Sequence, residues 1–196
     1  MHEVELSSKT PATVGTLKHI LDFARYPSQF QALRTGSPEQ MLLVGPGRYR
    51  VSAQEIDPTR QLVVSLLFYN DLLKSLGKAE NPDADSLQIM ALLPFSVPTE
   101  TEADVLRLIT LLNSVLPLGH FGLDPAQGPY YRYDWKVIER NVDGLLLIEL
   151  MGTILFFLEH LAYRLESVAT GQKSVEEASQ EDIHFAKPDA RSVSPQ

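Results

Sequence analysis

The sequence predicts an α+β fold, in which helices pack on an antiparallel sheet. Several runs of strand length follow one another across short turns, and strands joined in this way pair antiparallel. Helical segments with apolar stripes precede, interrupt and follow these runs. The expected element order is α-β-β-β-α-β-β-α. Helices packed on the sheet would bury the apolar surface of both layers.

The first predicted element is a helix that runs from Pro11 to about Arg34. Apolar residues recur there at helical intervals and include Phe30 and Leu33. Pro27 lacks a backbone donor, so it should break or kink this helix just before it.

Three strands are expected next. In MLLVGPGRYRVSAQEI a turn is predicted at Pro46 and Gly47, and a half-exposed strand follows because polar and apolar residues alternate. QLVVSLLFY is apolar on both faces, which favours a central strand. LQIMALLPF is the third strand. The polar connection between these two should be exposed, with one helical turn over residues 71–76.

The segment TETEADVLRLITLLNSVLP predicts the middle helix. Thr99 and Glu102 have the spacing of a capping box, and Pro117 should end the helix. The apolar residues form one stripe, whose members are Val105, Leu108, Ile109, Leu112, Val115 and Leu116.

A β-hairpin should follow the middle helix. GHFGLD predicts a short strand, and residues 124–128 form a turn with Pro and Gly at suitable positions. In the second strand, polar residues alternate with Tyr131, Tyr133, Trp135 and Val137. This aromatic face packs in the core or lines a binding groove, and burial trends favour the core.

The last predicted helix begins after Asp143, a suitable N-cap, and is apolar nearly all round from Leu145 to Leu158. Such a helix must be covered on more than one side. We expect no membrane span, because a bilayer requires ~20 apolar residues and Glu149 interrupts the run. Glu149 lies either on the outer edge of the helix, which is the favoured reading, or buried with a functional role.

These elements define one domain. Residues 1–10 are expected to be a flexible arm, residues 11–170 a single α+β domain, and residues 171–196 a disordered tail, since the tail has few large apolar residues.

Composition narrows the classes of function. The net charge of −8 disfavours nucleic acid as a partner. The absence of cysteine excludes disulfides, thiolate metal sites and a cysteine nucleophile, and it fits a reducing compartment. No secretory signal is visible in MHEVELSSKT, so a cytoplasmic location is expected.

No chemical motif stands out. There is no G-x-S-x-G elbow, and Gly45-Pro46-Gly47 lacks the lysine of a phosphate-binding loop. His120 has no other histidine at ligand spacing and is read as a strand-edge residue. We therefore expect no catalytic residue, metal or cofactor, and the protein is interpreted as not an enzyme.

The order of elements resembles a known group. LLPF before the middle helix, LLNSVLPLGHFGLD, and GPYYRYDW before a long final helix resemble the bacterial YbjN-like proteins, which are similar in fold to the class I type III secretion chaperones. The resemblance covers roughly residues 13–168. It implies a small, acidic, often dimeric protein that binds other proteins, and it supplies no catalytic residues.

The favoured function is a chaperone-like or adaptor module, a homodimer that holds a client protein segment. Its candidate contact residues are Leu106 and Leu111, which lie off the stripe of the middle helix, and the aromatic residues Tyr131, Tyr133 and Trp135. One alternative is a cystatin-like or NTF2-like domain that binds or transforms a small ligand, which would need polar residues on the concave face of the sheet. Another is a structural subunit of a larger assembly.

Overall fold

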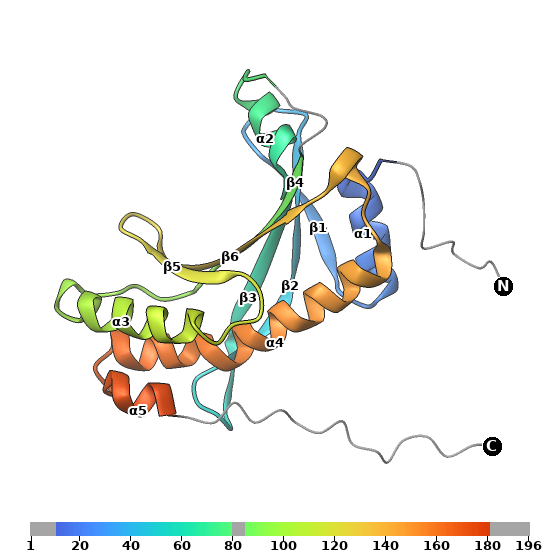
Figure 1. The fold of residues 1–196 in the computed structure, drawn as a ribbon. Helices are drawn as coiled ribbons and strands as arrows, with labels where there is room; N and C mark the ends of the chain where they lie inside the picture. Colours follow the sequence, from blue (N-terminus) through green and yellow to red (C-terminus); the bar gives the residue numbers. More distant parts are fainter. Residues whose placement is uncertain (1–10, 80–84, 181–196) are drawn as a thin grey trace, which may run out of the picture.

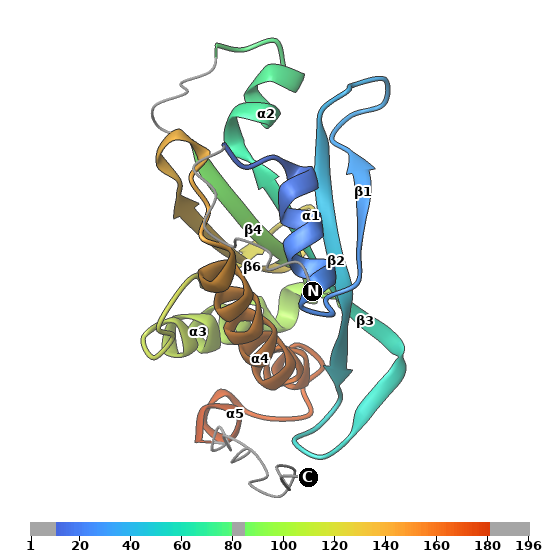
Figure 2. The ribbon, with the colours of Figure 1, turned by 90° about the vertical axis from the view of Figure 1, so that its right-hand side faces the viewer.

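The computed structural model describes residues 11–79 and 85–180, and this part of the chain has the predicted α+β fold (Figures 1 and 2). Six strands form one sheet in the order β1-β2-β3-β4-β6-β5, and every neighbouring pair is antiparallel. The expected arm and the end of the expected tail lie outside the described residues. The elements are α1 (Val14–Phe23), β1 (Ser28–Ala32), β2 (Gln40–Arg50), β3 (Ile56–Phe68), α2 (Tyr69–Ser75), β4 (Ser86–Leu92), η2 (Thr99–Thr101), α3 (Glu102–Asn113), β5 (His120–Asp124), β6 (Gly128–Lys136), η3 (Ile138–Arg140), α4 (Gly144–Ala169) and α5 (Val175–Gln180).

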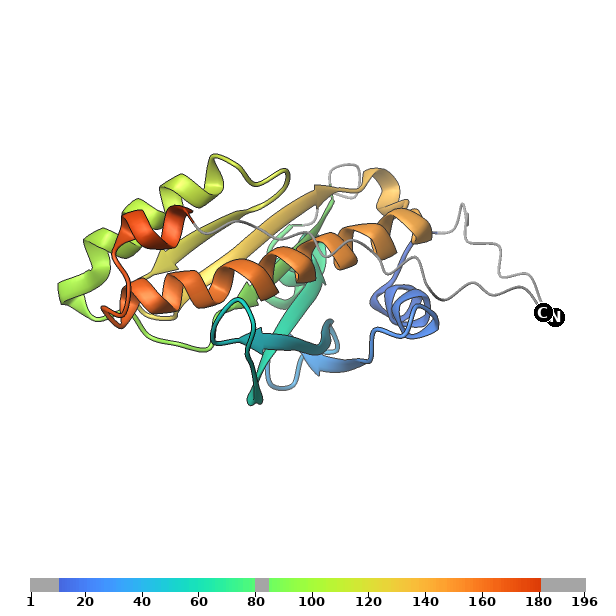
Figure 3. The ribbon, with the colours of Figure 1, turned by 90° about the horizontal axis from the view of Figure 1, so that it is seen from below.

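The helices α1, α3 and α4 pack on one face of this sheet. Figure 3 shows α4 lying across the strands, with α3 beside its C-terminal half and α1 near its N-terminal half. Alternate strand residues point toward these helices and form the core. The largest fully buried side chains on the strands are Tyr49, Tyr131, Phe68, Phe121, Leu42, Leu62, Leu66, Leu87 and Ile89.

The structure adds β1 and α5 to the predicted order, and the helical turn expected over residues 71–76 is present as α2. The expectation of helix as far as Arg34 was wrong, because α1 ends at Phe23 and the chain after Pro27 becomes the edge strand β1. Phe30 pairs with Leu42 of β2. Phe30 and Ala32 alternate with Gln29 and Gln31, which is the period-2 pattern of a strand, and pairing with β2 holds this segment extended.

The end of α1 is a Schellman motif, a turn in which the residue after the helix adopts a left-handed conformation. That residue is Arg25, with φ of 64°. The backbone N–H of Tyr26 donates to the Leu21 carbonyl over 2.8 Å, and that of Arg25 donates to the Asp22 carbonyl over 3.0 Å. Tyr26 is thereby held directly beside the helix end.

The turn predicted at Pro46 and Gly47 was also wrong. Strand β2 continues through these residues to Arg50, with a shift of register against β3 between Val44 and Gly47. A β-bulge can take up an irregular residue without ending the strand.

The middle helix starts later than predicted, because Thr99 and Glu102 do not form a capping box. Residues Thr99–Thr101 form the 3₁₀ turn η2, and α3 starts at Glu102 without a side-chain cap. The Thr101 hydroxyl donates instead to the Ala169 carbonyl at the end of α4, over 2.9 Å. A hydrogen bond to α4 is therefore found at this end of α3 in place of the predicted local side-chain cap.

The predicted apolar stripe of α3 is buried at Val105, Leu108, Ile109 and Leu112. Val115 is exposed, because the helix ends at Asn113 and the chain turns away.

The last predicted helix is α4, and Asp143 is its N-cap as expected. The Asp143 carboxylate accepts from the Leu146 N–H over 3.0 Å. The C-terminal half of α4 is held to the sheet by Glu166, which accepts from the Tyr49 hydroxyl over 2.9 Å and pairs with Arg60 over 2.5 Å. Burial and the charge of Glu166 raise the pKa of Tyr49.

By length and composition alone, α4 could cross a membrane. Its most apolar window of 18 residues has a mean hydropathy of 1.9, and 44% of that window is buried within the fold. The central helix of a folded domain meets the same criterion, and here the buried side packs on the sheet, α3 and α5.

The start of the expected disordered tail is ordered. After Gly171, residues Val175–Gln180 form α5, which packs on α3 and α4 with Val175 and Ala178 buried. Two small apolar residues one turn apart are sufficient to dock so short a helix, and the polar composition of the segment concealed them.

Candidate functional site

The structure does not bring the five predicted contact residues together. Tyr131 is fully buried, its hydroxyl donates to the Leu118 carbonyl over 3.0 Å, and burial raises its pKa. It is therefore not accessible to a partner. Tyr133 and Trp135 are partly buried against the core, as the favoured reading of this face expected.

Leu106 and Leu111 are both 43% exposed on the outer side of α3. Leu106 lines a hollow of 410 Å³ between η2, α3 and the β5–β6 turn. Leu111 lies outside this hollow, near the C-terminal end of α3, and exposed Val115 follows just beyond the end of the helix. The two predicted leucines thus belong to different surfaces.

Another hollow, of 540 Å³, is a groove between the end of α1 and the outer side of α4. We call it the α1–α4 groove. It is lined by Tyr26, Pro117, Ile148, Glu149, Gly152, Thr153, Phe156 and Phe157.

The α4 wall of the groove follows from helical spacing. Ile148, Gly152 and Phe156 are four residues apart, so they form one row along the helix. Glu149, Thr153 and Phe157 are likewise four residues apart and form the neighbouring row.

Gly152 makes room for the opposite wall, Tyr26. A Cβ atom at position 152 would lie 3.2 Å from the Tyr26 hydroxyl oxygen, closer than about nine in ten real Cβ contacts. Glycine costs roughly 1 kcal/mol inside a helix. The Schellman turn brings Tyr26 in from the other side, so α1 and α4 build the groove jointly.

Glu149 gives the groove a negative charge. Its side chain is exposed, as the favoured reading expected, and within the described residues its carboxylate forms no ion pair or hydrogen bond. Burial, and then the charge of Glu149, raise the pKa of the Tyr26 hydroxyl. Tyr26 therefore stays protonated at neutral pH, and among the described residues no lysine, arginine or histidine lines the groove.

Apolar surface continues from the groove along the first turns of α4. Leu145 is 59% exposed and lies one turn before Glu149, and Leu146 next to it is also exposed. Large exposed apolar surfaces on a folded domain mark interaction sites.

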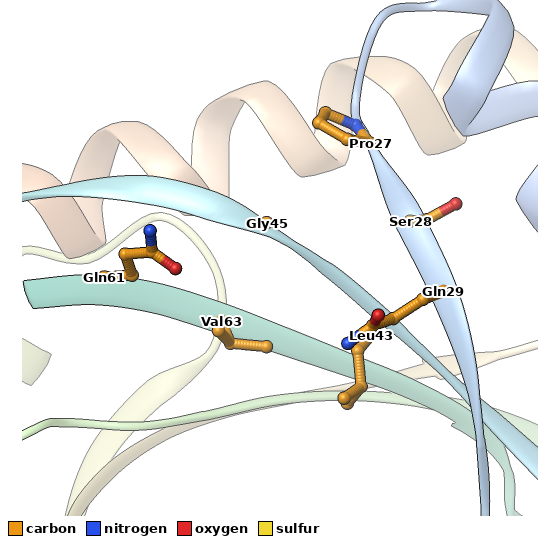
Figure 4. Close-up of a pocket in the computed structure, with 7 residues that line it drawn as sticks. All are labelled: Pro27, Ser28, Gln29, Leu43, Gly45, Gln61 and Val63. Carbon is orange, nitrogen blue, oxygen red and sulfur yellow. The ribbon is translucent and has the colours of Figure 1, made fainter.

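A second hollow lies on the face of the sheet opposite α4, in the region where β1, β2 and β3 run side by side (Figure 4). It measures 280 Å³ and has a mixed lining in which the amides of Gln29 and Gln61 accompany Leu43 and exposed Val63. It carries no charged side chain.

One charged cluster in the described part of the chain is structural. Asp85 is fully buried, and its carboxylate accepts from the backbone N–H of Asn70 and Ser86 and from Arg140 Nε over 2.7 Å. Asp71 takes the other side of the same guanidinium over 2.6 Å. With its acceptors satisfied, this cluster ties α2, β4 and η3 together and leaves no acid for chemistry.

No constellation typical of catalysis was found in the described part of the chain, which holds no group of three or more His, Asp and Glu side chains able to bind a metal ion. His120 is exposed at the start of edge strand β5, where its ring meets Tyr130 edge-on. This agrees with the strand-edge reading.

Sequence reasoning missed the groove as a whole, although two signals pointed to it. A charged residue and a glycine, Glu149 and Gly152, interrupt an otherwise apolar helix. Tyr26 was missed because the predicted helix continued past it, whereas α1 ends at Phe23 and the following turn places Tyr26 in the groove.

No protein-family model and no curated protein matches this chain.

Proposed function

We propose that this protein is a non-enzymatic protein-binding module of the chaperone-like or adaptor kind, cytoplasmic and dimeric, which holds a segment of a client protein. The observation that carries the proposal is the α1–α4 groove, an apolar depression on the outer side of a helix with further exposed apolar residues along the same side. Amphipathic segments of partner proteins bind in grooves of this kind.

The geometry gives less support to a small-ligand or enzyme domain. In cystatin-like and NTF2-like domains the ligand would lie between the sheet and its helix. Here the side chains that fill this space include Tyr49, Phe121 and Tyr131, all buried in the core cluster. The α1–α4 groove lies on the outer side of α4 instead.

Self-association is proposed through α3. Leu111, near the C-terminal end of α3, and Val115, just beyond it, are taken as an exposed apolar strip at this end of the helix. The resemblance to YbjN-like proteins and secretion chaperones is consistent with a dimer. An isologous contact, in which both copies use the same strip, is the commonest arrangement for such dimers.

Affinity capture with a variant that fills the groove tests client binding. The full chain is immobilised, exposed to lysate of the native host, and the captured proteins are identified by mass spectrometry. Gly152→Leu places a large side chain against Tyr26, whereas Thr110→Leu makes a similar apolar addition on exposed α3 and serves as the control.

A client should be captured by the wild type and by Thr110→Leu and lost with Gly152→Leu, provided that circular dichroism shows both variants to be folded. Identical capture by all three proteins would contradict a client site in the groove.

A further inference from the structure

We propose that the α1–α4 groove is specific for a basic amphipathic segment, in which apolar side chains enter the groove and a lysine or arginine next to them pairs with Glu149. This inference rests on the proposed protein-binding function and specifies the chemistry of the client.

The apolar lining of the groove favours apolar side chains in the bound segment. Ile148, Phe156 and Phe157 form its α4 wall, and Pro117 closes one end. A volume of 540 Å³ lies within the usual range for sites that enclose side chains or small ligands. The cleft remains accessible because Gly152 has no side chain.

The negative charge of the groove favours a positively charged side chain in the bound segment. Glu149 is its only charged lining residue, and within the described residues no cation neutralises it. A positively charged group would gain an ion pair there, whereas an anion would be repelled. The net charge of −8 attracts basic partners over a longer range and adds to the same preference.

Aromatic rings strengthen this preference. The ring of Tyr26 lies on one side of the groove and that of Phe156 on the other, where Phe156 is stacked on His160 with ring centroids 4.2 Å apart. Lysine and arginine bind favourably over such rings. The long stems of both residues also pack on apolar surface while the charged end reaches outward.

The site is tested first with three probes that share an eight-carbon alkyl chain, n-octylamine, 1-octanol and nonanoate, which carry a positive, a neutral and a negative head. Each is titrated into ¹⁵N-labelled full-length protein at neutral pH and followed by NMR. Octylamine is protonated under these conditions. It should bind most tightly and nonanoate most weakly, with shifts concentrated at residues 148–157.

Glu149→Gln should weaken octylamine binding about three- to five-fold, which is the upper range for an exposed ion pair, and should leave octanol binding unchanged. Asp104→Asn removes an exposed acid from α3 and is the matched control without effect. Equal binding of all three probes in the groove would overturn the charge preference and leave the proposed protein-binding function standing.

The second test uses fluorescence anisotropy with two labelled helical peptides, one of leucine and lysine and its twin of leucine and glutamate. The lysine peptide should bind the wild type, lose affinity with Glu149→Gln and fail to bind Gly152→Leu. Preference for the glutamate peptide, or no binding of either, would overturn the inference.

Light scattering tests whether a second copy of this chain, rather than a client segment, occupies the groove. If Gly152→Leu converts a dimer into a monomer, the groove is filled by a second copy of the chain and the inference is wrong. An unchanged mass is the expected result.

Discussion

The side-chain amide of Asn113, at the end of α3, pairs with the backbone of Phe121 in edge strand β5. Its Nδ2 donates to the Phe121 carbonyl over 2.9 Å, and its Oδ1 accepts from the Phe121 N–H over 2.8 Å. The amide thus occupies the place of a neighbouring strand and protects one edge of the sheet from pairing with other chains.

Asn113→Ala should lower the free energy of unfolding by about 1–3 kcal/mol, because it leaves two backbone groups of Phe121 without their partner. Urea unfolding followed by circular dichroism measures the change. Asn141→Ala, at an exposed position outside a helix or strand, is the control and should have little effect. Equal stability of the two variants would show that the Asn113 pairing does not stabilise the protein.

Arg25→Gly should stabilise the protein by about 1 kcal/mol. Arg25 has a left-handed backbone conformation that is strained for a residue with a side chain and relaxed for glycine. The equivalent positions after α2 and α4 are already glycine, Gly77 and Gly171, with φ of 67° and 70°. A rise in the melting temperature is the expected readout. Arg25→Gln removes the charge but keeps a side chain at the left-handed position and is the control, and a fall in stability with Arg25→Gly would contradict the Schellman assignment.

The stability of the protein should fall above about pH 10. Burial raises the pKa of Tyr49 and of Tyr131 above the usual tyrosine value of 10.0, so both stay protonated in the folded state after they ionise in the unfolded state. The unfolded state then binds fewer protons, and raising the pH favours it. Each such tyrosine should remove about 1.4 kcal/mol of stability per pH unit.

Tyr131→Phe tests this origin of the alkaline instability. The variant lacks one titrating group, so the slope of unfolding free energy against pH above pH 10 should become shallower than that of the wild type. Tyr69→Phe, at an exposed position, should keep the wild-type slope. Urea titrations at several alkaline pH values provide the slopes, and a slope unaffected by Tyr131→Phe would contradict the account.

Much of the fold was predictable because several sequence signals were local. Alternation placed Tyr131 and Val137 on the core side, and both are buried, Tyr131 within β6 and Val137 directly after it. The Asp143 cap was recognisable because a carboxylate before an apolar run is a strong start signal for a helix. These features depend on neighbouring residues alone.

The errors arose where distant contacts outweighed local ones. Thr101 bonds to the end of α4 rather than capping its own helix, and the segment around Phe30 became a strand because β2 lies beside it. The α1–α4 groove could not be predicted, because Tyr26 and Gly152 come together only through the packing of α1 on α4.

Light scattering at micromolar concentration provides the most direct test of the central claim, that this is a dimeric protein-binding module. The wild type should have twice the chain mass of 21.9 kDa. Leu111→Glu should reduce it to a monomer. Leu92→Glu, which changes a similarly exposed leucine on β4, should remain a dimer. A wild-type mass of 21.9 kDa, together with no binding of an apolar fluorescent dye, would contradict both the dimer and the client-binding surface.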